Sequence, residues 1–129
     1  MAGTNVFSKV ASYGKMTVYK WSWVGDASTG AILSRNSDIE IHGYITKFET
    51  NPGSPAPTAN YSLTLTDQEG CDVLGGMAAN RSATVSEQGI PLVGGAYSPS
   101  RVDGILTLAG TGQSVNSAVG DFFISVEGD

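Results

Sequence analysis

Polar and apolar residues alternate along two long segments of this sequence, residues 15–24 and 39–49. A period of two, rich in aromatic and β-branched residues, is typical of a β-strand because successive side chains point to opposite faces. In the first segment one predicted face carries Thr17, Tyr19, Trp21 and Trp23. In the second, one face carries Ile39, Ile41 and Ile45, and the other carries Glu40, His42, Tyr44, Thr46 and Phe48. Gly43 interrupts this second pattern, which predicts a bulge or the close approach of another backbone.

Shorter strands are predicted at residues 61–66, 71–74, 102–109 and 118–126. The last of these places Phe122, Ile124 and Val126 inward and Phe123 on the opposite face. Residues 51–58 cannot form a central strand, because their three prolines remove three backbone donors. Residues 1–14 show no sustained period, and we expect an extended N-terminal arm that becomes ordered only on a neighbouring surface.

About eight short strands at near-regular spacing, without a convincing helix, predict an all-β fold. The expected architecture is a β-sandwich or jelly roll of antiparallel strands. A chain of 129 residues is long enough for one domain with its own core. We therefore expect an arm at residues 1–14 and a single sandwich domain at residues 15–129.

The charge and cysteine content narrow the possible partners. The net charge is −5, and the seven basic residues are scattered, whereas nucleic-acid binding needs clustered Lys and Arg to neutralise phosphates. No apolar run approaches the roughly 18 residues of a membrane span, and the N-terminus lacks the apolar core of a signal peptide. With one cysteine, the chain has neither an internal disulfide nor a four-cysteine zinc site. We expect a soluble protein made in a reducing cytosol, with no nucleic-acid or membrane partner.

Three positions are candidates for chemistry, and each has a simpler structural interpretation. His42 is the single histidine and has no nucleophile motif around it, so a structural role is favoured. Cys71 lies in a hairpin without a nearby cation to stabilise a thiolate, which favours a small packed residue. Residues 67–72 carry three carboxylates, Asp67, Glu69 and Asp72, the first two at alternate positions as in a calcium loop. Position twelve counted from Asp67 is Ala78, however, so a solvated hairpin turn is favoured. No catalytic, cofactor-binding or metal-binding residue is predicted.

The aromatic row formed by Tyr19, Trp21 and Trp23 is the best candidate for binding. Aromatic side chains dominate both protein cores and protein interfaces, and a row of them on a sheet can also stack against sugars. The row is therefore half of the core, a protein interface or a carbohydrate platform, with the core favoured.

The order of several motifs also resembles a protein family. Residues 60–67 are Asn-Tyr-Ser-Leu-Thr-Leu-Thr-Asp, followed by Gly70, Asp-Val-Leu-Gly-Gly at 72–76, Ala-Asn-Arg at 79–81 and Glu-Gln at 87–88. This order resembles small accessory virion proteins of tailed bacteriophages, most clearly over residues 39–88 and more weakly over residues 102–126. The resemblance implies a virion structural protein, and we favour a capsid decoration or cement protein on the capsid surface. Its implied partners are the major capsid protein and further copies of itself, as a dimer or trimer, and it implies no cofactor.

Eight residues are predicted to contact a partner: Val6, Phe7, Val10, Trp21, Trp23, Pro52, Pro55 and Pro57. If the arm binds the shell, deleting residues 1–12 weakens that binding and leaves the isolated fold intact. Two alternatives remain open, a tail or baseplate component and a carbohydrate-binding adsorption module that needs Trp21 and Trp23 exposed. An enzyme is not expected, because the sequence shows no acid, base and nucleophile that belong together.

Overall fold

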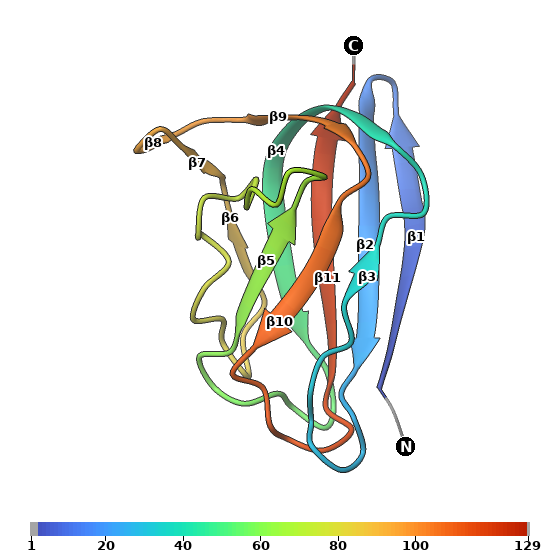
Figure 1. Cartoon of the computed structure of the whole chain (residues 1–129), viewed down its shortest axis with the longest axis vertical. Coiled ribbons are helices and arrows are strands. Elements are labelled where there is room, and N and C mark those ends of the chain that lie inside the picture. Colours follow the sequence, from blue (N-terminus) through green and yellow to red (C-terminus); the bar gives the residue numbers. More distant parts are fainter. Residues whose placement is uncertain (1–2, 129) are drawn as a thin grey trace.

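The computed structural model describes residues 3–128, which form strands joined by turns and loops (Figure 1). The strands are β1 (Thr4–Tyr13), β2 (Met16–Val24), β3 (Arg35–Asn36), β4 (Ile41–Pro52), β5 (Ser62–Thr66), β6 (Glu87–Gly89), β7 (Leu92–Val93), β8 (Ala96–Tyr97), β9 (Ser100–Gly104), β10 (Thr107–Thr111) and β11 (Val119–Glu127). The described range has eleven strands, where the sequence predicted about eight. No helix in it could span a membrane.

Two antiparallel sheets account for most of these strands. The large sheet has the order β1-β2-β11-β4, and the far edge of β4 pairs with β9 near its start and with β6 near its end. The small sheet has the order β3-β10-β5. It lies across one face of the large sheet, and the short β7–β8 hairpin projects from the side opposite to β1 (Figure 1). The predicted all-β antiparallel sandwich is therefore confirmed.

The core fills the space between the two sheets. The large sheet contributes Trp21, Trp23, Ile41, Ile45, Phe48, Phe122, Ile124 and Val126, all buried. The small sheet contributes Leu63, Leu65 and Leu108. The inward positions predicted for the last strand are correct, because Phe122, Ile124 and Val126 are buried and Phe123 is not.

The first residues form a strand rather than a separate arm. Residues of β1 from Thr4 to Tyr13 pair with β2 along its whole length, with one irregularity between Lys9 and Ala11. The ring of Phe7 packs against Trp21 with centroids 4.8 Å apart. The expected arm is thus corrected to an edge strand of the domain itself. Short-range periodicity did not show it because the irregularity between Lys9 and Ala11 breaks the alternation.

Two strand predictions change for local reasons. Phe48 was expected to lie opposite Ile45, yet both are buried on the same side, because the β4–β11 register shifts at Thr46 and the alternation restarts there. Residues 102–109 were expected to form one strand, but Ile105 and Leu106 separate β9 from β10, which belong to different sheets.

The predicted close approach at Gly43 is confirmed. This residue has a φ of 145°, and a Cβ built on it would fall against the backbone O of Glu127. Only glycine lets β4 pass β11 at this distance.

Candidate functional site

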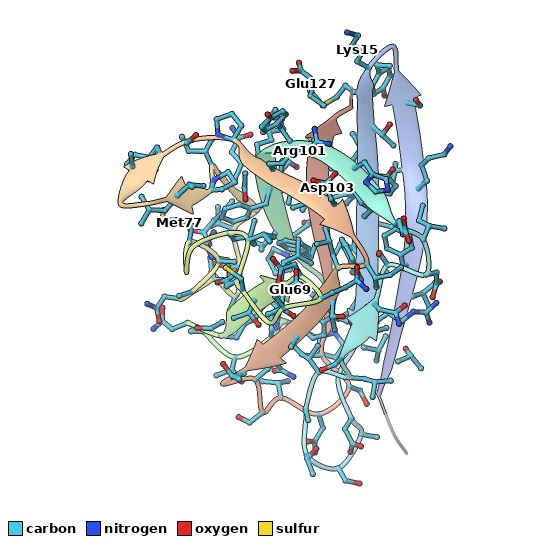
Figure 2. The ribbon with its side chains drawn as sticks, turned by 45° about the horizontal axis from the view of Figure 1, so that its top comes forward. Lys15, Glu69, Met77, Arg101, Asp103 and Glu127 are labelled. Atoms are coloured by element: carbon cyan, nitrogen blue, oxygen red, sulfur yellow. The ribbon has the colours of Figure 1, made fainter. Side chains whose placement is uncertain are left out.

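A charged cluster lies where β4 pairs with β9. His42 is directly opposite Asp103, and its Nδ1 is 3.0 Å from Asp103 Oδ1. Its Nε2 is 3.2 Å from Glu40 Oε1. Arg101 donates from Nε and Nη2 to the two oxygens of Asp103, at 3.0 and 2.8 Å, and its guanidinium lies over the ring of Tyr44. Figure 2 shows Arg101 and Asp103 side by side on β9.

The charges in this cluster stabilise one another's ionised forms. Hydrogen bonding to Asp103, and then to Glu40, raises the pKa of His42 above its usual 6.5. Hydrogen bonding to Arg101, and then to His42, lowers the pKa of Asp103 to about 2. Because both imidazole nitrogens face carboxylate acceptors, the protonated ring, which donates from both nitrogens, fits this site best.

This arrangement supports a structural role for His42. A general base must reach a substrate or a nucleophile, usually in a cleft, whereas both ring nitrogens of His42 contact carboxylates on an exposed part of the sheet. Asp103 is 61 positions away in the chain. No local pattern in the sequence indicates this pair, because only the β4–β9 register places the two residues opposite each other.

The acidic loop of residues 67–72 is a turn whose carboxylates bind its own backbone. Oδ1 of Asp67 accepts hydrogen bonds from the N–H groups of Glu69 and Cys71, both at 3.0 Å. Oδ2 of Asp72 accepts one from Gly76 N–H at 2.9 Å. The predicted turn is confirmed, but the returning strand predicted at residues 71–74 is wrong. Only an isolated bridge joins Thr66 to Asp72, and the chain then continues as turns, because the carboxylate of Asp72 binds the N–H groups of Leu74 and Gly76. Residues 3–128 contain no group of three or more His, Cys, Asp or Glu side chains that could hold a metal ion.

Cys71 was expected to be packed, and the structure corrects this. Its thiol is free and the residue is exposed. The turn that Asp67 holds together lies outside the two sheets, so no core surface covers the side chain.

The two tryptophans predicted as interface residues are in the core. Trp21 and Trp23 are fully buried. Trp21 Nε1 donates to the backbone O of Arg35 at 3.1 Å, and Trp23 packs edge-on against Tyr61 with ring centroids 5.7 Å apart. The interface assignment of these two residues is therefore wrong, and so is a carbohydrate platform built on them, because neither ring reaches the surface.

The other predicted interface residues differ in their exposure to solvent. Val6 and Val10 on β1 are exposed, while Phe7 is partly buried against the core. Among the prolines, Pro55 is exposed, Pro52 is half-buried and Pro57 is buried. The proline segment is bonded to its own domain, since Gly53 N–H donates to Val119 O and Val119 N–H donates to Pro55 O. Pro57 is buried and thus not available to a partner. For Val6, Phe7, Val10, Pro52 and Pro55, contact with a partner stays a prediction.

The structure adds one exposed surface that the sequence did not indicate. In the β7–β8 hairpin, Val93 and Tyr97 are 46% and 65% exposed. Gly94 and Gly95 form its turn with positive φ values of 59° and 84°. The double glycine predicted only a loop, because two-residue strands are too short to show an alternation.

Two open hollows lie near the exposed strands. We call the first the β7–β8 groove: it has a volume of about 310 Å³ and lies between the loop at residues 67–75 and the β7–β8 hairpin. Its lining includes Val73, Leu92 and Val93, together with the carboxylates of Asp67 and Asp72.

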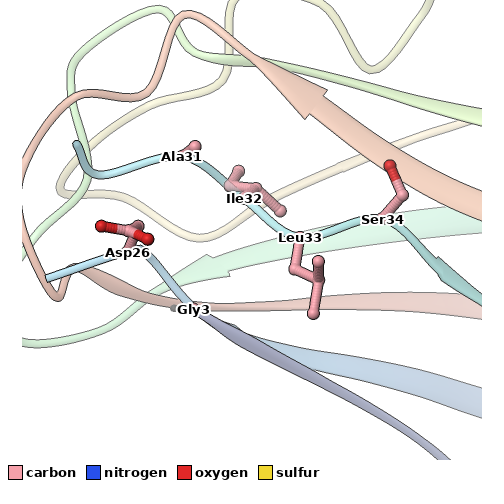
Figure 3. Close-up of a pocket in the computed structure, with 6 residues that line it drawn as sticks. All are labelled: Gly3, Asp26, Ala31, Ile32, Leu33 and Ser34. Carbon is pink, nitrogen blue, oxygen red and sulfur yellow. The ribbon is translucent and has the colours of Figure 1, made fainter. Parts of the chain in front are cut away.

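The second hollow lies beside the start of β1 and has a volume of about 360 Å³. Figure 3 shows its lining: Gly3, Asp26, Ala31, Ile32, Leu33 and Ser34. The carboxylate of Asp26 already accepts hydrogen bonds from the N–H groups of Ser28 and Thr29, which lower its pKa. This hollow therefore presents apolar side chains and one carboxylate that is committed to a turn.

Comparison with known proteins adds little to this description. No protein-family model matches the chain, and no curated protein matches it. Among solved structures, a cupin domain from Bordetella pertussis Tohama I aligns over 98% of this chain and 96% of that chain, with 11% sequence identity and a TM-score of 0.39. The fold assignment rests on the strand pairing of the chain itself.

Proposed function

We propose that this chain is a structural protein of a tailed-bacteriophage virion, and specifically a capsid decoration or cement protein. In this proposal a homo-oligomer binds across neighbouring subunits of the major capsid protein on the outside of the head and stabilises the shell. The chain is made in the cytoplasm of the host bacterium, and its role is binding rather than catalysis. Modest affinity at each site is sufficient, because many copies and many contacts act together.

The observation that supports a binding role is the distribution of exposed apolar side chains. Among residues 3–128, seven of the eleven large exposed hydrophobic residues lie in β1 or in the segment from residue 85 to residue 97: Val6, Val10, Tyr13, Val85, Ile90, Val93 and Tyr97. These two segments lie at opposite edges of the large sheet (Figure 1). Apolar side chains gathered on edges, while a complete core lies elsewhere, indicate surfaces for protein contact.

The virion assignment itself is supported by the motif order at residues 60–88. In the structure these motifs form β5, the turn that Asp67 and Asp72 organise, and β6. They build one side of the sandwich, so their resemblance to phage virion proteins extends to structural residues rather than to a catalytic site.

The test is the location and copy number of the protein in purified virions of the phage that encodes it. Heads and tails are separated and each fraction is quantified by mass spectrometry. Copies in a fixed ratio to the major capsid protein in the head fraction support the proposal. A few copies in the tail fraction would replace it with the tail or baseplate alternative, and absence from both fractions would refute any virion role.

Binding to heads that lack the protein tests the surface involved. We expect the double variant Val6→Ser, Val10→Ser to bind such heads more weakly than the wild type, because it removes two exposed apolar side chains from the edge strand. Ile39→Ser is the matched control, since Ile39 is also exposed but lies outside both segments. Equal loss of binding in the variant and the control would argue against β1 as the contact.

A further inference from the structure

The lysines of the β1–β2 hairpin differ from the other basic side chains. Each basic residue beyond residue 25 forms an ion pair: Arg35 with Asp38, Lys47 with Glu49, Arg81 with Glu87 and Arg101 with Asp103. Lys9, Lys15 and Lys20 form none with any residue from 3 to 128. No Asp or Glu precedes Asp26 in the sequence, and Glu127 on β11, which pairs with Met16 beside the hairpin tip, forms no ion pair with Lys15. Residues 1–25 have three lysines and a net charge of +3, while residues 26–129 have four basic and twelve acidic residues and a net charge of −8.

The same hairpin also exposes large apolar side chains. Val6, Val10 and Tyr13 are 56%, 52% and 70% exposed. Tyr13 pairs with Met16 at the end of the hairpin, next to the turn at Gly14 and Lys15. Figure 2 shows Lys15 at this tip, beyond the end of the sandwich. A surface that is both apolar and basic is suited to a protein partner with apolar and acidic groups.

The β7–β8 groove of the same chain has the complementary character. Val73, Leu92 and Val93 give it apolar walls. Asp67 and Asp72 give it negative charge, and their carboxylates also accept backbone hydrogen bonds within the turn. The lining also includes Arg101, but the charge of this residue is balanced by its two hydrogen bonds to Asp103. A hollow of about 310 Å³ is at the small end of ligand pockets, so it suits one or two protein side chains better than a larger ligand.

We propose that the tip of the β1–β2 hairpin of one copy docks in the β7–β8 groove of a second copy. Tyr13 then lies between the apolar walls of the groove, and the ammonium group of Lys15 lies beside the carboxylates of Asp67 and Asp72. This proposal identifies the surface for the self-association included in the proposed function, and it does not depend on binding to a capsid.

The charge of the β1–β2 hairpin also argues against a symmetric contact between two copies of the chain. A symmetric contact of one β1–β2 hairpin with another would bring six lysines together without a carboxylate from either hairpin. The docked contact instead joins two different surfaces, because the β7–β8 hairpin projects from the side of the molecule opposite to β1. Contacts of this head-to-tail kind close into a ring or continue as a filament.

Sedimentation velocity of the purified full chain tests the proposal without any other virion protein. We expect oligomers that weaken between about 0.1 M and about 1 M salt, as the Debye length falls from about 10 Å to about 3 Å. We also expect Lys15→Glu and Tyr13→Ser each to weaken association by about tenfold or more. Lys47→Glu makes the same charge change outside the hairpin and serves as the matched control. A monomer at all protein concentrations, or equal effects of Lys15→Glu and Lys47→Glu, would overturn the proposal.

Mixing two defective variants distinguishes the head-to-tail contact from a symmetric one. Lys15→Glu damages the hairpin tip and keeps the groove, while Val93→Glu damages the groove and keeps the tip. Both residues are exposed, so both variants should fold, which circular dichroism verifies. In the mixture, the intact tip of the Val93→Glu variant can still dock in the intact groove of the Lys15→Glu variant. We therefore expect a one-to-one heterodimer that neither variant forms alone. A mixture that stays monomeric would overturn the proposal. A negative result would refute the hairpin–groove contact without affecting the head-fraction experiment. The contact and the capsid role are therefore tested separately.

Discussion

At the scale of single residues, the pairing of His42 with Asp103 changes the ionisation of both side chains. We expect a pKa above 6.5 for its imidazole, because Asp103 and Glu40 accept hydrogen bonds from the charged ring. This contribution to stability is fully present below pH 6.5 and is lost as the pH rises through the folded-state pKa. The lowered pKa of Asp103 works in the opposite direction, since its contribution is present above pH 3.8 and is lost as the pH falls towards about 2.

An NMR titration measures the pKa of His42 directly, because the chain has one histidine and its imidazole signals need no assignment. Asp103→Asn should lower the measured pKa, whereas Asp38→Asn, at an exposed carboxylate paired with Arg35, should not. A wild-type pKa at or below 6.5 would show that the two contacts do not persist in solution.

Tyr61 is a second residue for which the structure makes a definite prediction. Its ring is fully buried against Trp23, its hydroxyl has no hydrogen-bond partner among the described residues, and burial raises its pKa to about 12. Tyr61→Phe keeps the ring and removes an unsatisfied polar group, so we expect it to be neutral or to stabilise the fold by up to about 1 kcal/mol. Tyr61→Ala should cost about 3–5 kcal/mol, as for other large aromatic truncations. Chemical denaturation compares both, and a clear loss in Tyr61→Phe would mean that the hydroxyl is bonded in solution.

At the scale of elements, the crossing of β4 past β11 depends on Gly43. Gly43→Ala adds a Cβ against the Glu127 backbone and forces a side chain into a φ of 145°, so we expect a loss of about 3 kcal/mol. Gly70 also has a positive φ, of 87°, but has nothing within 4 Å of a built Cβ. Gly70→Ala should therefore cost only about 1 kcal/mol. Similar losses in both variants, measured by thermal unfolding, would show that β4 shifts to admit the methyl group.

The edge strand β1 contributes to the stability of the fold as well as to any contact with partners. Phe7 packs against both Tyr19 and Trp21, so Phe7→Ala should lower the free energy of unfolding by about 2–3 kcal/mol. Val6→Ala, at an exposed position on the same strand, should change it by less than about 0.5 kcal/mol.

Removal of residues 1–12 should destabilise the whole domain, which revises the expectation that the isolated fold stays intact. A truncated protein that unfolds at the wild-type temperature would show that β2 can serve as the edge of the sheet without β1.

At the scale of the whole molecule, both tryptophans report on the packing of the two sheets. Trp21 and Trp23 are enclosed between them, so we expect blue-shifted emission, weak quenching by acrylamide and no change on addition of glycans. A single cooperative unfolding transition should shift the emission to longer wavelength, since one core holds both side chains. Emission typical of solvated tryptophan in the native protein would contradict the burial of both side chains between the two sheets.

The alternation of polar and apolar residues was enough to predict the class of fold and several of its inward faces. Alternation at residues 15–24 and 118–126 was sufficient because those strands are regular and have one buried face, so local period and burial agree. It failed where a register shift breaks the period, as at Val10 and Thr46, and where one apolar run is divided between two sheets, as at residues 102–109.

Which residues contact one another depends on the pairing of the strands. The pairing of His42 with Asp103, the burial of the two tryptophans and the groove opposite the basic hairpin all depend on the order and register of strands far apart in the chain. Local composition carries no information on that order, because cross-strand neighbours are selected by long-range packing rather than by adjacent residues.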